Sequence, residues 1–168
     1  MEVILALAIS IFVFEVVFFV YMSLFRSWDI GFLRGRTEDE ARRAVQAVSL
    51  ELRQAAPVIT VPYPGVISYQ KDVPKYIYLY NPATKYGDFI TGSGATTNYV
   101  LKMVEANSLD DSNYGAGRVL AVDLVPPTGL TGGTRFSNGA GLVNISIISQ
   151  VQNNSITMDT VVYPRSVL

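Results

Sequence analysis

Two carboxylates, Glu2 and Glu15, lie at the start and near the middle of a long apolar segment, residues 3–25. An ionised carboxyl group in hydrocarbon costs several kcal/mol unless it is neutralised, paired or close to the membrane surface. The bilayer surface or the α-amino group of a neighbouring chain could satisfy Glu2. Glu15 is either a protonated or snorkelling carboxyl group or a contact to a partner helix. Because the two residues lie about 140° apart around a helix, they predict two separate contacts.

Other kinds of site chemistry are excluded or only weakly indicated. The sequence has no His and no Cys, which excludes disulfides, zinc or haem sites built on these residues, and His- or Cys-based catalysis. Residues 92–94 and 115–117 are G-x-G pairs that lack the third glycine of a dinucleotide-binding loop. The net charge is −1, and no basic segment indicates nucleic-acid binding. We therefore expect a protein that is not an enzyme and that binds no cofactor, metal or nucleic acid.

Two further patterns have both a functional and a structural interpretation. Residues 110–113, Asp-Asp-Ser-Asn, offer oxygen atoms for Ca²⁺. They lack the longer ligand series, ending in Glu, of an EF-hand loop, which favours a solvated turn. Tyr76, Tyr78 and Tyr80 alternate with apolar residues and so share one face of a strand. We expect them to pack within the domain, since a ligand-stacking surface would require exposed rings.

The apolar segment itself predicts a transmembrane helix, residues 1–25. Its core of 23 residues spans about 35 Å as a helix, and the hydrocarbon part of a bilayer is about 30 Å thick. No Lys or Arg precedes it, and no small-x-small cleavage site follows, which argues against a cleaved secretory signal. Arg26, Arg34 and Arg36 come after it. By the positive-inside rule these charges place the C-terminal region in the cytoplasm, and a basic leader ahead of Met1 would reverse that expectation.

The next region, residues 26–56, predicts the amphipathic second half of the helix. Thr37 and Glu40 form a capping-box pattern, and Gly31 and Gly35 weaken the helix just before it. We expect either one long helix with a bend or two helices joined at this point. Further along, apolar residues recur at spacings of four and three and so form one stripe. The stripe comprises Ala41, Val45, Val48, Leu52 and Ala55.

Residues 57–168 predict a β-rich globular head. Segments of β-branched and aromatic residues alternate with turn signals such as Tyr63-Pro64-Gly65 and Asn138-Gly139. The expected strands are residues 66–70, 75–80, 99–106, 117–125, 142–151 and 155–163, with a hairpin turn at residues 152–154. The predicted fold class is therefore α+β, a long N-terminal helix packed through its second half on one face of an antiparallel sheet.

Residues 1–9, Met-Glu-Val-Ile-Leu-Ala-Leu-Ala-Ile, resemble the N-terminal signature of type IV pilins and type II secretion pseudopilins. In that signature a short apolar stretch leads to a Glu, which Glu2 matches, and then to a helix rich in Val, Leu and Ala. Residues 43–55 are similar to the end of the first helix in minor pilins of the PilW type and J-type minor pseudopilins, and residues 161–166 to their final strand. The family's basic leader, cleavage-site Gly and first mature Phe do not precede Glu2, so we expect that the chain starts inside the motif.

This resemblance implies a pilin-like fold and a structural assembly subunit of a type IV pilus or a type II secretion pseudopilus. Such a subunit is inserted in the inner membrane and then packed by its apolar helix into a filament or tip complex with other pilins or pseudopilins. The resemblance implies that Glu2 pairs with the N-terminal amine of an adjacent subunit. It also implies that prepilin peptidase and an assembly platform are partners, and that the head is periplasmic or extracellular.

Two further expectations concern the type of subunit. Pilins frequently have a C-terminal disulfide loop, so the lack of Cys favours a pseudopilin-like or minor subunit over a major pilin. The alternative from another class is a signal-anchored bitopic membrane protein with an extracytoplasmic β-rich binding domain, which never enters a filament.

Overall fold

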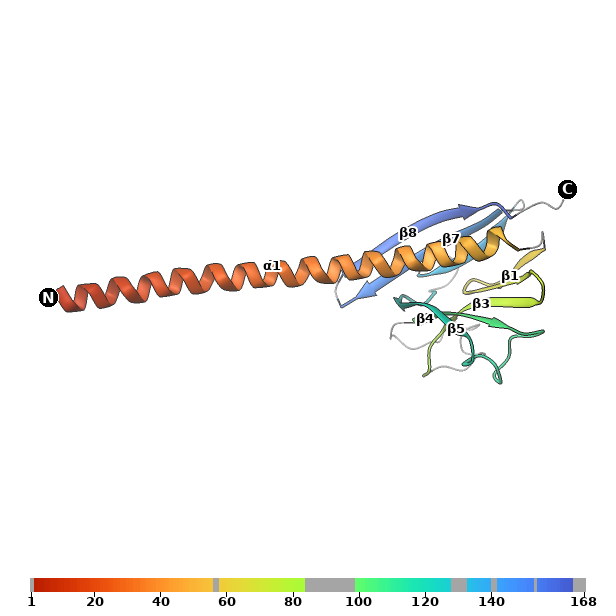
Figure 1. The fold of residues 1–168 in the computed structure, drawn as a ribbon, viewed down its shortest axis with the longest axis horizontal. Coiled ribbons are helices and arrows are strands. Elements are labelled where there is room, and N and C mark those ends of the chain that lie inside the picture. Colours follow the sequence, from red (N-terminus) through yellow and green to blue (C-terminus); the bar gives the residue numbers. More distant parts are fainter. Residues whose placement is uncertain are drawn as a thin grey trace. The chain divides into compact units, whose positions relative to one another are not determined.

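The computed structural model describes residues 2–55, 58–83, 99–127, 133–139, 142–152 and 154–164. In these residues one helix, α1 (Glu2–Arg53), is followed by a curled antiparallel sheet of eight strands (Figure 1). The strands are β1 (Ile59–Tyr63), β2 (Val66–Gln70), β3 (Pro74–Tyr80), β4 (Tyr99–Glu105), β5 (Arg118–Leu124), β6 (Arg135–Gly139), β7 (Leu142–Val151) and β8 (Asn154–Val162). The predicted α+β fold class is confirmed. The chain divides into two compact units, residues 1–35 and 36–168.

The first unit is the N-terminal part of α1. No Pro interrupts the helix, so every backbone N–H beyond the first turn can bond one turn back. The hydroxyl of Ser10 donates a 2.8 Å hydrogen bond to the carbonyl oxygen of Ala6. This hydroxyl group therefore needs no water molecule as its acceptor. The helix continues through Gly31 and Gly35. The alternative of two separate helices is therefore wrong.

The predicted capping box at Thr37 is also wrong. Thr37 lies inside α1 and is fully buried. Glu40 pairs with Arg43 at 3.4 Å and accepts a 3.3 Å hydrogen bond from the backbone N–H of Val122. The physical reason is that the helix does not begin at Thr37. The backbone N–H groups near Thr37 already donate hydrogen bonds within the helix, so none of them needs a capping side chain.

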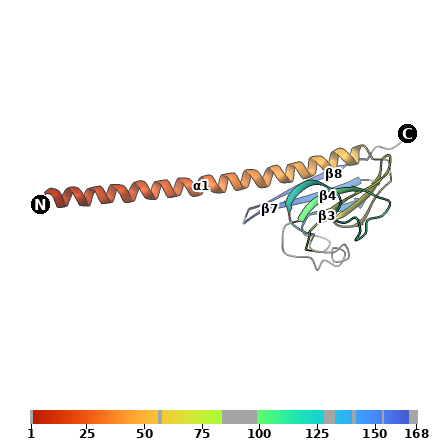
Figure 2. The same cartoon turned by 60° about the horizontal axis from the view of Figure 1, so that its bottom comes forward.

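The second unit begins with the last turns of α1, which pack on the sheet through one stripe of side chains. In both views these turns run alongside β7 and β8 (Figure 2). The fully buried apolar residues of the stripe are Ala41, Ala44, Val48 and Leu52. Val45, which the spacing placed in the stripe, lies at its edge and is only partly buried, since Ala44 occupies the central row.

The sheet has the strand order β1-β2-β3-β4-β5-β7-β6, and β8 pairs with the other side of β7. All pairings are antiparallel, and the join between β5 and β7 consists of one pair, Leu124 with Ser149. The side-chain amide of Asn138 on β6 donates a 2.9 Å hydrogen bond to the carbonyl oxygen of Ile59 on β1. The two ends of the strand order therefore approach each other, which curls the sheet around its core.

All six predicted strands are present, and two others were missed. β1 alternates in burial but contains Pro62, which argues against a strand, and β6 is a short, mostly exposed segment, Arg-Phe-Ser-Asn-Gly, without regular alternation. Asn138 and Gly139, predicted as a turn, are the last residues of β6, because five cross-strand pairs with β7 extend the ladder through them. Residues 92–94 lie outside the described residues.

The tyrosines of β3 pack against the segment that precedes β5, as predicted. Tyr78 is fully buried, and Tyr76 and Tyr80 are partly buried. The ring of Tyr114 lies 5.5 Å from that of Tyr78 and 5.0 Å from that of Tyr80, between centroids. The Tyr78 hydroxyl donates a 2.7 Å hydrogen bond to the carbonyl oxygen of Tyr114. Burial raises the pKa of Tyr78 to about 12.

Gly117, in the second G-x-G pair, serves this packing. A Cβ at this position would lie 2.7 Å from the carbonyl oxygen of Met103 and 2.9 Å from the hydroxyl oxygen of Tyr78. Its own N–H donates to that hydroxyl at 3.3 Å. The glycine is therefore needed for a close backbone approach.

Candidate membrane and assembly surface

Side chains of the kind that form protein cores are exposed along the first unit. Residues 2–32 are all classed as exposed, and Phe14, Phe19 and Trp28 have exposed fractions of 79%, 76% and 77%. Soluble monomers rarely expose a contiguous apolar patch larger than a few hundred Å², and larger ones mark contacts with proteins or membranes. This surface therefore needs a lipid or protein neighbour.

The same segment has the dimensions of a membrane span. α1 contains a stretch long and apolar enough to cross a bilayer, and none of that stretch is buried in the chain itself. A helix that forms the core of a soluble domain would be buried, and the second half of α1 is an example. The first half is compatible with a membrane anchor.

The two carboxylates singled out by the sequence both lie on this exposed helix, and the structure does not bring them together. Glu2 is in the first turn of α1, and Glu15 is 13 positions further on, about 20 Å along the axis. Neither makes a hydrogen bond or an ion pair with any residue that the structure describes. Their assembly roles stay predictions.

The end of the apolar segment carries two aromatic residues that sequence reasoning did not assign. Trp28, the only Trp of the chain, follows Arg26 by two residues, and Phe32, four residues further on, precedes Arg34 by two. Trp28 and Phe32 are 77% and 66% exposed. Trp is enriched where a helix leaves the hydrocarbon for the headgroups, and Arg contacts lipid phosphates there. The position of this Trp directly after the apolar run is the signal that could have identified it.

Charged residues fix the second half of α1 on β5. Arg36 donates to the carboxylate of Asp123 at 3.0 Å, next to the contact between Glu40 and the N–H of Val122. Asp123 has a φ of 58°, a left-handed backbone conformation that is uncommon for a residue other than Gly. With this backbone turn at Asp123, both Val122 and Asp123 of β5 contact side chains of the helix.

A second contact lies near the end of α1. Tyr69 on β2 donates a 3.2 Å hydrogen bond to Glu51, and Arg118 on β5 lies 3.9 Å from the other carboxylate oxygen of Glu51. Burial and the adjacent Glu51 raise the pKa of Tyr69. The apolar stripe places Glu51 on the opposite, polar face of the helix, and that pattern contains no signal for these contacts.

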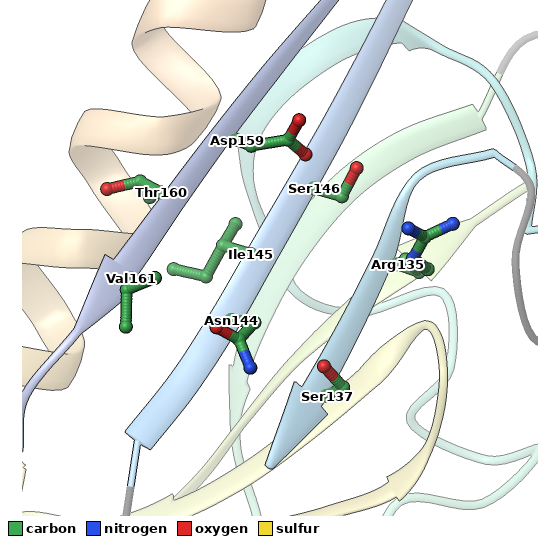
Figure 3. A pocket seen from close by; sticks show the side chains of 8 residues that line it. All are labelled: Arg135, Ser137, Asn144, Ile145, Ser146, Asp159, Thr160 and Val161. Carbon is green, nitrogen blue, oxygen red and sulfur yellow. The ribbon is translucent and has the colours of Figure 1, made fainter. Parts of the chain in front are cut away.

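The outward face of β6, β7 and β8 has a shallow polar hollow of about 410 Å³ (Figure 3). Arg135, Ser146 and Asp159 form one row across the three strands, and Ser137, Asn144 and Val161 form the next. The hollow is open, and its hydrogen-bonding groups are spread along the sheet. It could hold a polar ligand weakly, and it offers no enclosed reaction space.

The turn predicted at residues 110–113 is present. Asp110 accepts hydrogen bonds from the hydroxyl groups of Ser112 and Ser108 and, at 2.9 Å, from the backbone N–H of Ser112. These bonds, that of the Ser112 hydroxyl first, hold the pKa of Asp110 below its usual value. Both carboxylate oxygens are therefore occupied within the turn. In the parts of the chain that the structure describes, no group of three or more acidic residues could hold a metal ion.

Comparisons of the chain with protein-family models, with curated proteins and with solved structures give no match.

Proposed function

We propose that this chain is a structural assembly subunit of the pilin or pseudopilin kind. The first half of α1 holds it in the inner membrane, and the same surface then packs into a filament or tip complex. The observation that carries the proposal is the exposed apolar surface of residues 2–32 on a helix whose second half is part of a folded domain.

The physical argument is that one apolar helix surface suits two environments in succession. Lipid chains and neighbouring apolar helices are about equally apolar, so the helix can exchange one for the other at small cost in hydrophobic free energy. The free energy that favours assembly over the bilayer must then come from specific polar contacts between subunits. A buried pair between Glu2 and the N-terminal amine of an adjacent subunit would supply one, because an unpaired carboxylate in that environment is costly.

The proposal places the second unit outside the cytoplasm, in the periplasm or on the filament surface. Its partners are other subunits of the same kind, prepilin peptidase and an assembly platform. The resemblance of residues 1–9 to the pilin signature supports this part of the proposal.

Replacement of Glu2 tests the assembly role. Glu2→Ala should block incorporation into filaments and leave the second unit folded, since Glu2 makes no contact with it in the described part of the chain. The matched control is Asp29→Ala, which removes a carboxylate beyond the apolar segment and should incorporate normally. The measurement is the amount of subunit in sheared filaments or in cross-linked membrane complexes of the native organism. Normal incorporation of Glu2→Ala would contradict the proposal.

The second candidate function is a bitopic membrane protein whose head binds a ligand, and the polar hollow of β6, β7 and β8 favours it. Mass spectrometry of the N-terminal peptide from the native organism discriminates the two. An N-methylated residue a few positions ahead of Glu2 indicates prepilin-peptidase processing and a filament subunit. An unprocessed N-terminus favours the bitopic protein.

A further inference from the structure

Glu15 is the only charged side chain within residues 3–25. It is exposed on α1 and has no polar partner among the described residues. In a bilayer or between packed apolar helices, water does not reach such a group. Its carboxylate then stays ionised only if another molecule supplies a cation.

Arg26 is the matching cation on the same helix face. It follows Glu15 by 11 residues, which is three full turns and about 20°, or about 16 Å along the axis. Arg34, the other basic side chain of residues 2–35, lies about 100° away from Glu15 around the helix. Arg26 likewise makes no ion pair in the described chain, and the two charges are too far apart to meet within one helix.

The surface between the two charges is shaped for contact. A groove lined by Phe18, Phe19, Met22 and Ser23 ends at Arg26. On the N-terminal side of Glu15, Ala8 and Ile11 lie on the same face, about 20° and 40° from it. Along the centre of this face the small Ala8 precedes Glu15 and the large Phe19 follows it.

We infer that a second copy of this chain docks on this face, parallel to the first and displaced by about 16 Å along the helix axis, so that Glu15 of one copy pairs with Arg26 of the next. The inference rests on the proposed function and names one of its partners. The displacement also sets Ala8 and Ile11 of one copy against Phe19 and Met22 of the next. The small Ala8 then faces the large Phe19.

Other arrangements of two copies do not satisfy the charges. Copies at the same depth in the membrane place Glu15 against Glu15, which is repulsive when both are ionised. An antiparallel pair could match the charges, but the positive-inside rule gives all copies of one membrane protein the same orientation. The pair thus forms when one copy moves along the axis of another, as in a filament, and is absent while both remain level in the bilayer.

Cysteine cross-linking tests the displacement directly, because the chain has no Cys of its own. Two differently tagged full-length copies, one with Ala8→Cys and one with Phe19→Cys, are expressed together in the native organism and oxidised. The expected result is a cross-linked dimer from this pair, with little or none from Ala8→Cys in both copies. A dimer from the level pair only, or from neither pair, would overturn the inference.

Charge exchange tests the ion pair. Glu15→Arg alone and Arg26→Glu alone should each reduce incorporation by about tenfold or more, because each sets like charges against each other. The double variant should restore it, and so should co-expression of the two single variants, since each then supplies the partner that the other lacks. Failure of both rescues would overturn the inference.

The Glu2→Ala variant separates this inference from the proposed function. If Glu2→Ala blocks incorporation and the Glu15 and Arg26 variants have no effect, the chain assembles through other contacts and only the inference fails. If Glu2→Ala incorporates normally, the proposed function fails first.

Discussion

The two parts of α1 use their apolar side chains in opposite ways. In residues 2–32 the apolar side chains surround the helix and are exposed, whereas in residues 36–53 most of them form one stripe on the sheet, whose centre is buried. Both parts belong to one uninterrupted helix. The comparison shows that the two parts share one backbone conformation and differ in how their apolar side chains are distributed around the helix, which decides what each part can contact.

The largest effect on the free energy of unfolding is expected from one of three leucines of this helix. Leu52 is fully buried, and Leu50 and Leu24 are 60% and 65% exposed. Leu52→Ala should lower the free energy of unfolding of the second unit by about 3 kcal/mol, because it leaves a cavity under the helix. Leu50→Ala and Leu24→Ala should change it by less than about 0.5 kcal/mol. Denaturant titration of the full chain in detergent measures this, and equal losses for all three would break the comparison.

The next effect is a pH dependence confined to the second unit. Because the pKa of Tyr78 is raised to about 12, the folded state favours the neutral phenol. The neutral Tyr78 phenol contributes fully to the free energy of unfolding below a pH of about 10. This contribution is lost between about pH 10 and 12, at roughly 1.4 kcal/mol per pH unit. Unfolding titrations across this range should show the loss, with a smaller slope in Tyr78→Phe. An unchanged slope in that variant would assign the effect to other groups.

A smaller effect concerns the backbone where β5 meets the helix. Asp123→Ala should destabilise the second unit by about 1–2 kcal/mol more than Asp123→Gly does, since both lose the ion pair with Arg36 but only Gly adopts the left-handed φ without strain. Thermal unfolding of the two variants makes the comparison. Equal midpoints would mean that the φ of 58° carries no strain.

The smallest effect on the free energy of unfolding is expected on the polar face of the same helical turns, opposite the buried stripe. Arg42 and Glu38 form an exposed pair at 3.2 Å, four residues apart. Arg42→Ala should lower the free energy of unfolding by no more than about 0.5 kcal/mol. The denaturation midpoint should also move less at high salt. A loss close to that of Leu52→Ala would show that the polar face contributes as much as the stripe.

The sequence predicted those features that depend on local patterns. Apolar runs, alternation and turn residues identified the long helix, six strands and the α+β class. The central strands were found because they combine β-branched and aromatic residues, whereas Pro62 interrupts that pattern in β1 and β6 lacks it. The capping box failed because the same Thr-x-x-Glu pattern also fits a helix interior, in which the helix itself bonds the backbone.

Contacts between distant residues could not be predicted. The sequence patterns made Arg36 a charge that follows the apolar segment, Glu40 part of a capping box and Glu51 a charge on the polar helix face. Their partners Asp123, Val122 and Tyr69 are identified only by the folded sheet. At the exposed surface the sequence identified Glu2 and Glu15 as costly in hydrocarbon. The face that Glu15 shares with Arg26 follows from the same count of turns that separates Glu2 from Glu15, and it was missed because Arg26 was considered only as a charge that follows the apolar segment.

The contacts of α1 with β5 also set an order of events during synthesis. Arg36 and Asp123 are 87 positions apart in the chain, and Glu40 and Val122 are 82 apart. At ribosomal rates of about 5–20 residues per second, the second half of α1 is made roughly 4–17 seconds before β5 exists. Throughout that interval the stripe that ends at Leu52 has no sheet to cover it. Under the proposed function the apolar first half enters the membrane during this time, which would anchor the chain before its domain can fold.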